Sequence, residues 1–203
     1  MYRSETASGN HDARLTFLKG FLRRPRDVGS IIPSSRFLER LIVAQAEVHR
    51  ARSVVELGPG TGGTTRALLR ALPAGASLLA LELDREFAAT VAAANPDPRL
   101  FVECGSAEHL EQALARHQLV RPQAVVSGIP FSTMPPELGR RVLEAVRETL
   151  APGGVFVAYQ VRDSVAQLAA PLFGEPEVRW SLLNVPPLRV FRWRVPGSGR
   201  ATE

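Results

Sequence analysis

A short segment near residue 60 has the residue types and spacing of a ligand-binding loop. Residues 54–63 read V-V-E-L-G-P-G-T-G-G, an apolar run with one acid followed by closely spaced glycines. Glycine has no Cβ, so the backbone at such positions can approach a ligand closely. A dinucleotide fingerprint needs glycines at its first, third and sixth positions, and this spacing fits it only in part. The segment predicts the nucleotide crevice of an open α/β sheet.

A second acidic position follows one strand–helix unit later. Residues 77–83 read S-L-L-A-L-E-L, a buried strand that ends in Glu82 and is followed by Asp84. A carboxylate at the tip of the second strand is placed to accept hydrogen bonds from both ribose hydroxyls of an adenosine. We assign that role to Glu82, because Asp84 is well placed to cap the helix that begins near Arg85. The structural alternative is that both acids only start a helix.

The elements that must position these residues alternate between strand and helix. Apolar runs predict strands at 53–57, 77–82, 100–103, 124–127 and 154–160, and Ala- and Leu-rich stretches predict helices at 36–49, 63–72, 85–94, 107–117, 136–150 and 163–172. Such alternation predicts an α/β fold with a doubly wound, mostly parallel sheet and helices on both of its faces.

The last part of the chain departs from this alternation. Two runs, 178–183 and 188–195, are joined by the short segment N-V-P-P and have no helix between them. Strands joined by so short a loop pair antiparallel, which completes a seven-stranded sheet with a C-terminal hairpin. We expect Arg189, Arg192 and Arg194 to lie on the solvated face of this hairpin.

Composition limits the class of protein. At 203 residues with 45% hydrophobic content, the chain is long enough for one well-buried domain. Cys104 is the single cysteine, which suits a reducing compartment, and its position at the end of an apolar strand predicts a buried structural thiol. The four histidines lack metal-ligand spacing, so we expect no metal. No apolar run is long enough to span a membrane, and no secretory signal is recognisable, so we expect a cytoplasmic protein.

The two ends of the chain are rich in arginine. The net charge is +5, and residues 1–26 hold six cations and two acids while residues 178–202 hold five arginines and no acid. Within the first of these segments, residues 14–26 place leucines and phenylalanines on one helical face with cations around its flanks, as in helices that lie in a lipid headgroup layer. This pattern suggests a polyanionic surface, either lipid or nucleic acid. The alternative is a helix packed on its own domain and an ordinary solvated surface.

The acid-x-Gly-x-Gly-x-Gly pattern resembles motif I of the class I S-adenosylmethionine (SAM) methyltransferases. In that family the motif I acid lies near the amino-acid moiety of the cofactor. The family often has an aspartate after its third strand that accepts from the adenine amino group, whereas this chain has Ser106 there. The C-terminal hairpin also distinguishes this family from nicotinamide-binding domains. The resemblance implies SAM as cofactor and a binding set of Glu56, Gly58, Gly60, Thr61, Gly62, Glu82, Ser106, Ala107 and Ser127.

The segment after the fourth strand is where an acceptor would lie. Residues 127–136 read S-G-I-P-F-S-T-M-P-P. Methyltransferases that act on nucleic-acid amines carry Asn/Asp-Pro-Pro-Tyr or Asn-Leu-Pro-Tyr here, and the aromatic ring stacks on the base. This chain keeps the proline and an aromatic residue, but it lacks the asparagine and the tyrosine hydroxyl.

Four segments together resemble the bacterial phosphatidylethanolamine N-methyltransferases, which bind membranes peripherally. They are F-L-K-G-F-L-R-R-P-R-D-V-G-S-I-I-P-S-S (17–35), V-E-L-G-P-G-T-G (55–62), V-V-S-G-I-P-F (125–131) and N-V-P-P-L-R-V (184–190). The resemblance implies methylation of an ethanolamine headgroup toward choline on an anionic membrane surface. It implies a membrane-anchoring helix or lid within 1–35 and a SAM-binding domain at 36–197. We expect a monomer.

Methyl transfer from a sulfonium is an in-line displacement, so such an enzyme must align donor and acceptor and exclude water. Candidate acceptors for the amine proton are the backbone carbonyls of Gly128 and Ile129 and the hydroxyl of Tyr159. Phe131 and Tyr159 are candidates for holding methylated ammonium groups against their ring faces. Core packing is the alternative for both rings.

Two other functions stay open. The first is methylation of an adenine in ribosomal RNA, whose enzymes share the N-terminal helix, the glycine motif and the proline after the fourth strand. Those enzymes append a helical RNA-binding domain, whereas this sequence ends soon after its last predicted strand, so we favour the lipid substrate. The second is a non-catalytic, SAM-binding protein at the membrane.

Overall fold

The computed structural model of the chain describes residues 36–184 and 186–197. The predicted N-terminal helix at 14–26, the loop that follows it and Val185 of the N-V-P-P segment lie outside these residues. Their predicted roles therefore stay predictions.

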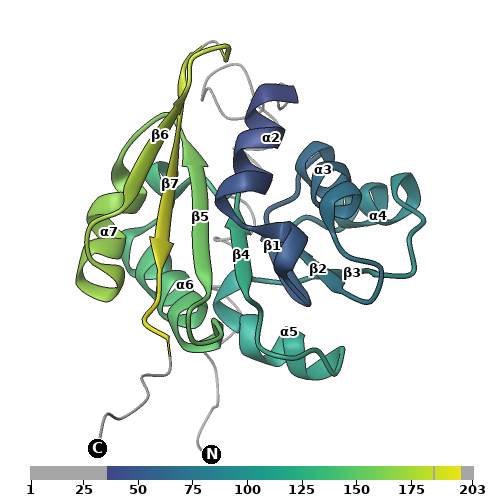
Figure 1. The fold of residues 1–203 in the computed structure, drawn as a ribbon. Coiled ribbons are helices and arrows are strands. Elements are labelled where there is room, and N and C mark those ends of the chain that lie inside the picture. The colour runs from purple at the N-terminus through teal and green to yellow at the C-terminus, as the bar shows by residue number, and fades with distance from the viewer. Residues whose placement is uncertain (1–35, 185, 198–203) are drawn as a thin grey trace, which may run out of the picture. The chain divides into compact units, whose positions relative to one another are not determined.

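A seven-stranded sheet forms the centre of the described part of the chain (Figure 1). Its strand order is β3-β2-β1-β4-β5-β7-β6, with β1 to β5 parallel and β7 antiparallel to both β5 and β6. The strands are β1 Ser53–Leu57, β2 Ser77–Glu82, β3 Leu100–Cys104, β4 Ala124–Ser127, β5 Val155–Gln160, β6 Glu177–Ser181 and β7 Leu188–Arg194. The chain extends from β1 to one side and from β4 to the other, so the strand order reverses between β1 and β4. The predicted fold class is confirmed.

Helices cover both faces of this sheet. They are α2 Arg36–Gln45, α3 Gly63–Ala71, α4 Arg85–Ala94, α5 Leu110–Arg116, α6 Pro136–Thr149 and α7 Ser164–Phe173, with 3₁₀ turns η1 Val48–Arg50, η2 Ala107–His109 and η3 Phe131–Thr133. The predicted capping role of Asp84 is confirmed, because its carboxylate accepts hydrogen bonds from the backbone N–H groups of Glu86 and Phe87 at 2.8 and 3.2 Å. The predicted helix at 36–49 ends earlier, at Gln45, because Glu47 adopts a left-handed backbone with φ 51°.

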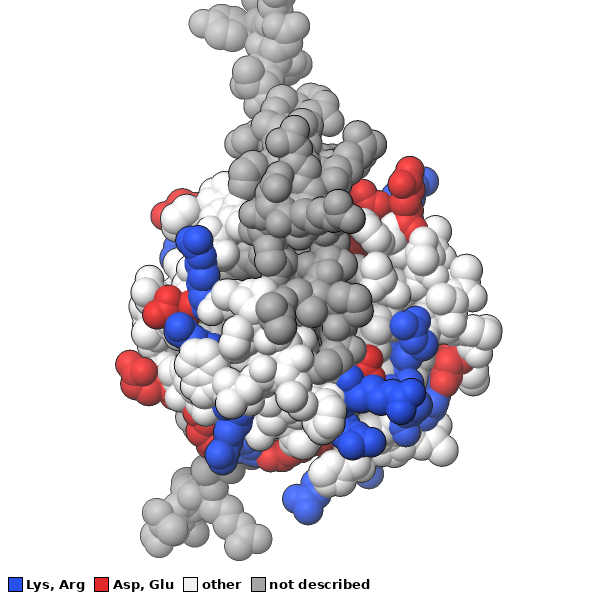
Figure 2. All heavy atoms as spheres, turned by 90° about the horizontal axis from the view of Figure 1, so that it is seen from above, with Lys and Arg blue, Asp and Glu red and all other residues white. Residues whose placement is uncertain are grey.

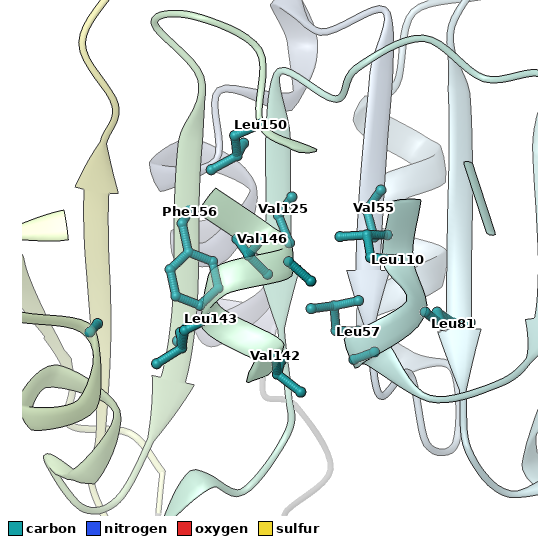
Figure 3. Packing of buried hydrophobic residues seen from close by; sticks show 14 of the residues in the cluster. Val55, Leu57, Leu81, Leu110, Val125, Val142, Leu143, Val146, Leu150 and Phe156 are labelled. Atoms are coloured by element: carbon teal, nitrogen blue, oxygen red, sulfur yellow. The ribbon is translucent and has the colours of Figure 1, made fainter. Parts of the chain in front are cut away.

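Alternate residues of the strands pack into two separate hydrophobic clusters. Val55 and Leu57 of β1 face α5, α6 and α7 (Figure 3), whereas Val54 joins residues of α2 and α3 on the other face. Side chains alternate between the faces of a strand, and here both faces are covered. This explains why the central strands read as continuous apolar runs.

The C-terminal hairpin corrects one prediction. Arg189 and Arg192 project from opposite faces of β7 because they are three residues apart. The Arg192 side chain is mostly buried, donates to the Gln45 carbonyl at 3.0 Å and pairs with Glu47 at 2.7 Å. The prediction that Arg192 lies on a solvated face is therefore wrong, since α2 and the turn after it cover that face of the hairpin.

Cys104 corrects a second prediction, because its side chain is exposed rather than buried. It is the last residue of β3, which is the edge strand of the sheet, so no neighbouring strand covers its outer side. An apolar sequence run did not reveal that this strand lies at the edge.

Among the helices of the described residues, none is long and apolar enough to cross a bilayer.

Candidate functional site

The loops that follow four parallel strands meet at the carboxyl edge of the sheet. The first residue of three of these loops continues the strand pairing. The backbone N–H of Gly58 donates to the Leu81 carbonyl at 2.9 Å and that of Gly128 to the Leu57 carbonyl at 2.9 Å. The N–H of Gly105 donates to the Glu82 carbonyl at 2.8 Å. The base of this group of loops is therefore an extension of the sheet, located where the strand order reverses and where the sequence predicts the crevice.

The glycine loop between β1 and α3 uses conformations that suit glycine. Gly58, Gly60 and Gly62 all have positive φ, at 70°, 54° and 77°. A Cβ on Gly58 would also lie 3.2 Å from Cγ1 of Ile129, so the loop after β4 approaches this position closely. Thr61, at the outer end of the loop, is exposed. The loop therefore lies close to the post-β4 segment, and its residues at 58 and 60 are only partly buried.

Glu56 is a fully buried carboxyl at the end of β1. Its Oε2 accepts a hydrogen bond from the Thr65 hydroxyl at 2.6 Å, and its Oε1 has no hydrogen-bond partner among the described residues. Burial raises the pKa of Glu56 to about 8, the Thr65 hydrogen bond lowers it and the nearby Glu82 carboxyl raises it. A buried oxygen without a partner is costly, so Glu56 has unused capacity to accept a hydrogen bond from a ligand.

Glu82 lies beside the glycine loop, as predicted for a carboxylate at the tip of β2. Its Oε2 accepts from the backbone N–H of Gly60 at 3.1 Å, and its Oε1 accepts from that of Asp84 at 3.1 Å. Burial raises the pKa of Glu82, and backbone hydrogen bonds from Asp84, Gly60 and Leu83 oppose part of this increase. The carboxylate is thus fixed in orientation next to the loop.

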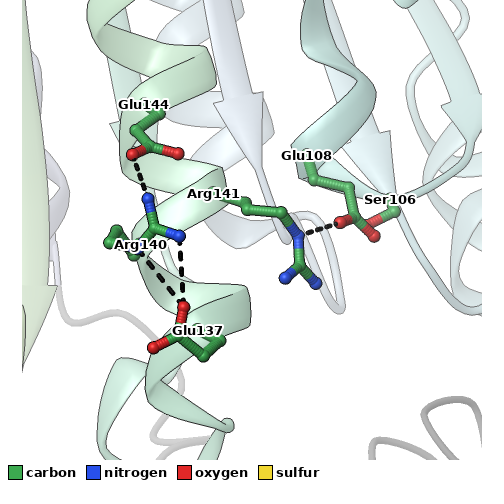
Figure 4. Close-up of polar contacts among 6 residues, drawn as sticks. All are labelled: Ser106, Glu108, Glu137, Arg140, Arg141 and Glu144. Atoms are coloured by element: carbon green, nitrogen blue, oxygen red, sulfur yellow. Dashed lines mark hydrogen bonds and ion pairs between the residues drawn. The ribbon is translucent and has the colours of Figure 1, made fainter.

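The segment after β3 contains a polar network that the sequence did not predict. The Ser106 hydroxyl donates to Oε1 of Glu108 at 3.2 Å, and Oε2 of Glu108 binds Nε of Arg141 from α6 at 2.8 Å (Figure 4). On the same helix Arg140 pairs with Glu137 and Glu144. Although burial raises the pKa of Glu108, the hydrogen bonds from Arg141 and Ser106 bring it below its ordinary value. Ala107, next to Ser106, is buried in the core cluster of α5 and α6.

The segment after β4 folds back on itself. The Ser127 hydroxyl oxygen accepts from the backbone N–H of Ile129 at 3.2 Å. The Ile129 carbonyl accepts from the N–H of Phe131 at 3.0 Å and from Nε2 of Gln160 at 2.7 Å. Two donors satisfy a carbonyl oxygen, so Ile129 has no capacity left for an amine. No hydrogen bond to the Gly128 carbonyl is found within residues 36–184 and 186–197, so it stays the available backbone acceptor.

The two candidate aromatic residues are not brought together. Phe131 packs in the cluster beneath α6, where a Cβ on Gly139 would lie 3.5 Å from its ring. Tyr159 packs against the cluster on the opposite face of the sheet. Its hydroxyl lies 3.3 Å from the Thr64 hydroxyl, and burial, with the nearby Glu56, raises its pKa. The two rings therefore do not form facing walls of one pocket.

Sequence reasoning missed three side chains that shape this edge. Thr65 binds Glu56, Thr64 contacts Tyr159, and Gln160 holds the Ile129 carbonyl. A signal for the threonines was available, because the first turn of a helix after a glycine loop faces back toward the strand that precedes it. Gln160 had no such signal beyond its position at the end of β5. Within the described residues, no group of three or more His, Cys, Asp or Glu side chains is placed to share a metal ion.

Comparisons with known proteins agree with this geometry. The sequence model of the ribosomal RNA adenine dimethylase family matches residues 24–118. Ornithine lipid N-methyltransferase of Singulisphaera acidiphila is 33% identical over 141 residues, which cover 69% of this chain and 73% of that protein. Ribosomal RNA small subunit methyltransferase A of Laribacter hongkongensis is 35% identical over 113 residues, covering 56% of this chain and 41% of that protein.

A solved structure shares the fold. N-methyltransferase NodS of Bradyrhizobium japonicum, in complex with S-adenosyl-L-homocysteine, aligns with a TM-score of 0.69 at 14% identity and covers 90% of this chain and 98% of its own.

The chain belongs to the class I SAM-dependent methyltransferases, enzymes whose methyl donor is S-adenosylmethionine. Within that class it shares sequence with a lipid-amine methyltransferase and with ribosomal RNA methyltransferases. The matched region spans 41% of the Laribacter hongkongensis enzyme and 54% of the ribosomal RNA small subunit methyltransferase A of Cutibacterium acnes.

Proposed function

We propose that this enzyme methylates the amine of a lipid headgroup at a membrane surface, with phosphatidylethanolamine converted toward phosphatidylcholine. The match to ornithine lipid N-methyltransferase, which extends over most of both chains, is the observation that supports a lipid amine most strongly. Phosphatidylethanolamine and ornithine lipid both present a primary amine beside anionic groups. The arginine-rich ends of the chain suit such headgroups.

On the cofactor side, the proposed binding residues fit SAM. The glycine loop would hold the methionyl part of the cofactor against its backbone. The ammonium group of the cofactor would favour the ionised form of Glu56, whose Oε1 has no partner in the described part of the chain and would accept a hydrogen bond from that group. Glu82 would accept from the ribose hydroxyls. Ser106 already donates to Glu108, so its hydroxyl oxygen stays available as an acceptor near the adenine.

On the acceptor side, the chain must bind the amine in its neutral form, after the ammonium proton has passed to solvent water, orient its lone pair and exclude water from the transfer. SAM supplies a methyl group activated on a sulfonium. The Gly128 carbonyl would accept a hydrogen bond from the amine and hold the nitrogen lone pair in line with that methyl group. Gln160, whose Oε1 is buried without a partner in the described part of the chain, lies beside this segment and would offer a second acceptor.

The second candidate function is methylation of an adenine in ribosomal RNA. It is favoured by the family match over residues 24–118 and by the RNA methyltransferase relatives. Against it, Phe131 packs into the core instead of offering its ring to a base, and Ser127 binds its own loop where the base-directed enzymes have an asparagine or aspartate.

Label transfer separates these functions. The enzyme is incubated with methyl-labelled SAM and, in parallel, with phosphatidylethanolamine vesicles, ornithine lipid vesicles and unmethylated small-subunit ribosomal RNA, with Glu82→Ala as the inactive control. Label in a lipid that depends on Glu82 supports the proposal, and the two lipid arms identify the headgroup. Label in RNA alone would replace it with the second function. SAM binding without transfer to any acceptor would support a non-catalytic protein.

A further inference from the structure

An exposed apolar turn lies at the tip of the C-terminal hairpin. Between β6 and β7, the side chains of Leu182 and Leu183 are 71% and 64% exposed, and Trp180 on β6 is 53% exposed. Turns usually carry Gly, Pro, Asn, Asp or Ser, whose backbone preferences and polarity suit them. Large apolar side chains grouped at such a position indicate a contact surface.

This turn is held in a defined conformation. Ser181 and Asn184 are both buried, and the Ser181 hydroxyl donates to Oδ1 of Asn184 at 2.7 Å. The hydrogen bond closes the turn beneath the two leucines. Leu182 and Leu183 lie between these two bonded residues, and their side chains project outward.

The turn lies at the same edge of the sheet as the crevice. β5 runs parallel to β1 and β4, and its last residue, Gln160, pairs with Arg189 at the start of β7. The turn that precedes β7 is therefore next to the carboxyl end of β5. α2, whose first turn carries the exposed Phe37, contacts both β6 and β7.

Arginines lie around the turn, whereas the arginines at the far end of the hairpin are paired with acidic residues. Arg162 and Arg179 are exposed, and neither has an ion pair among the described residues. Arg189 lies 4.9 Å from the ring of Trp180 and 3.7 Å from the carboxylate of Asp163. Figure 2 looks onto this end of the molecule, where both basic and acidic side chains lie around the margin of an uncharged surface.

At the far end of the hairpin the pattern is different. There Arg192 pairs with Glu47 and Glu177, and Arg194 also pairs with Glu47. Apolar side chains surrounded by arginines fit a layer in which acyl chains lie beneath anionic phosphates. Trp180 suits the boundary between the two, since its ring is apolar and its N–H is polar.

We propose that this turn surface, formed by Trp180, Leu182, Leu183, Arg162, Arg179 and Arg189, docks on an anionic lipid bilayer and places the crevice at the headgroup layer. The proposal rests on the proposed lipid substrate and adds to it a contact that is separate from residues 1–35. The leucines enter the acyl boundary, and the arginines bind lipid phosphates.

Two matched variants test this docking in the full chain. Leu182→Glu and Val120→Glu make the same change at similarly exposed positions, 71% and 63%, but Val120 precedes β4 at the opposite edge of the sheet. Binding is measured by co-sedimentation with vesicles of equal parts phosphatidylglycerol and phosphatidylcholine. Leu182→Glu should weaken vesicle binding roughly tenfold, the effect of withholding one leucine from an apolar layer. Val120→Glu should bind like the original protein.

Tryptophan emission gives an independent readout. Trp193 is buried, so a blue shift on vesicle addition reports on Trp180, and Trp180→Phe should abolish the shift. Equal vesicle binding by Leu182→Glu and Val120→Glu, with no emission shift, would overturn the proposal. A concentration-dependent dimer lost in Leu182→Glu, with vesicle binding unchanged, would instead assign the turn to a second copy of this chain.

Failure of the docking and failure of the function give different results. Leu182→Glu should keep the SAM affinity of the original protein and its methyl transfer to detergent-dispersed phosphatidylethanolamine. Leu182-dependent vesicle binding without methylation of any lipid would retain the docking and reject the lipid substrate. Lipid methylation with Leu182-independent vesicle binding would retain the function and reject the docking.

Discussion

Glu56 is an acid that the folded protein holds in its protonated form over a wide pH range. Burial raises the pKa of this carboxyl from its ordinary value of 4.5 to about 8. Between these values the folded state binds a proton that the unfolded state has released. The contribution to stability is therefore complete below the unfolded pKa and is lost as the pH rises through the folded one.

Replacement of Glu56 by glutamine should remove this pH dependence. The original protein, without cofactor, should lose thermal stability steadily from about pH 5 to about pH 9, whereas Glu56→Gln should show a shallower decline. Melting temperatures across this range test the prediction. Glu111→Gln, which alters an exposed acid on α5, serves as the control and should keep the original slope. An unchanged slope in Glu56→Gln would show that Glu56 is already ionised in the folded state.

Gly128 provides a second residue-level test, because a side chain there would collide with Tyr159. A Cβ at position 128 would lie 2.5 Å from the Tyr159 hydroxyl oxygen and 3.0 Å from the Gly58 carbonyl oxygen. Gly128→Ala should destabilise the protein by about 1–3 kcal/mol, as overpacking does. Tyr159→Phe should recover part of this loss in the double variant, because it removes the nearest atom. Urea denaturation of both single variants and the double variant measures the coupling, and fully additive effects would contradict the collision.

At the scale of elements, the glycine loop couples β1, α3 and the segment after β4. Gly58 combines a positive φ of 70° with the approach of Ile129, so a side chain is both strained and crowded there. We expect Gly58→Val to lose SAM binding in calorimetry. Gly75→Val is the matched control, because a Cβ at that position meets no atom within 4 Å. SAM affinity that is equal in the two variants would reject the loop as the cofactor site.

The elements could be predicted from sequence more fully than the contacts between them. The strands at 53–57 and 77–82 have their predicted bounds, because a buried parallel strand reads as an apolar run bounded by polar and glycine residues. The same signal cannot show which strand lies at the edge, and Cys104 was misjudged for that reason.

Side-chain partners depend on packing between distant segments. Arg192 meets the end of α2, and Phe131 and Tyr159 lie in clusters on opposite faces of the sheet. None of these relations has a local sequence signal. The glycine loop and Glu82 were recognisable because their spacing within one strand–helix unit determines their neighbours, whereas Thr65 and Gln160 act through contacts that only the folded chain reveals.

At the scale of the whole molecule, we expect two separate parts of the chain, residues 1–26 and the turn surface, to contribute to membrane binding. Deletion of residues 1–26 should lower methylation of phosphatidylethanolamine in anionic vesicles much more than it lowers SAM affinity, because this segment combines apolar and cationic residues. Activity on vesicles and on detergent-dispersed lipid, together with calorimetric SAM binding, tests this. Equal vesicle binding with and without the segment would remove its anchoring role.

The three backbone hydrogen bonds that extend the sheet at Gly58, Gly105 and Gly128 also bear on how such enzymes diversify. They fix the start of each loop through main-chain groups, and these hydrogen bonds do not depend on any side chain. Differences in substrate then arise in the outer portions of the loops and in the segments that contact them. Enzymes with this fold can in this way keep one arrangement for the methyl donor and act on acceptors as different as a lipid headgroup and a ribosomal adenine. Substitutions in the outer loops change which acceptor binds and leave the binding of the methyl donor largely unchanged.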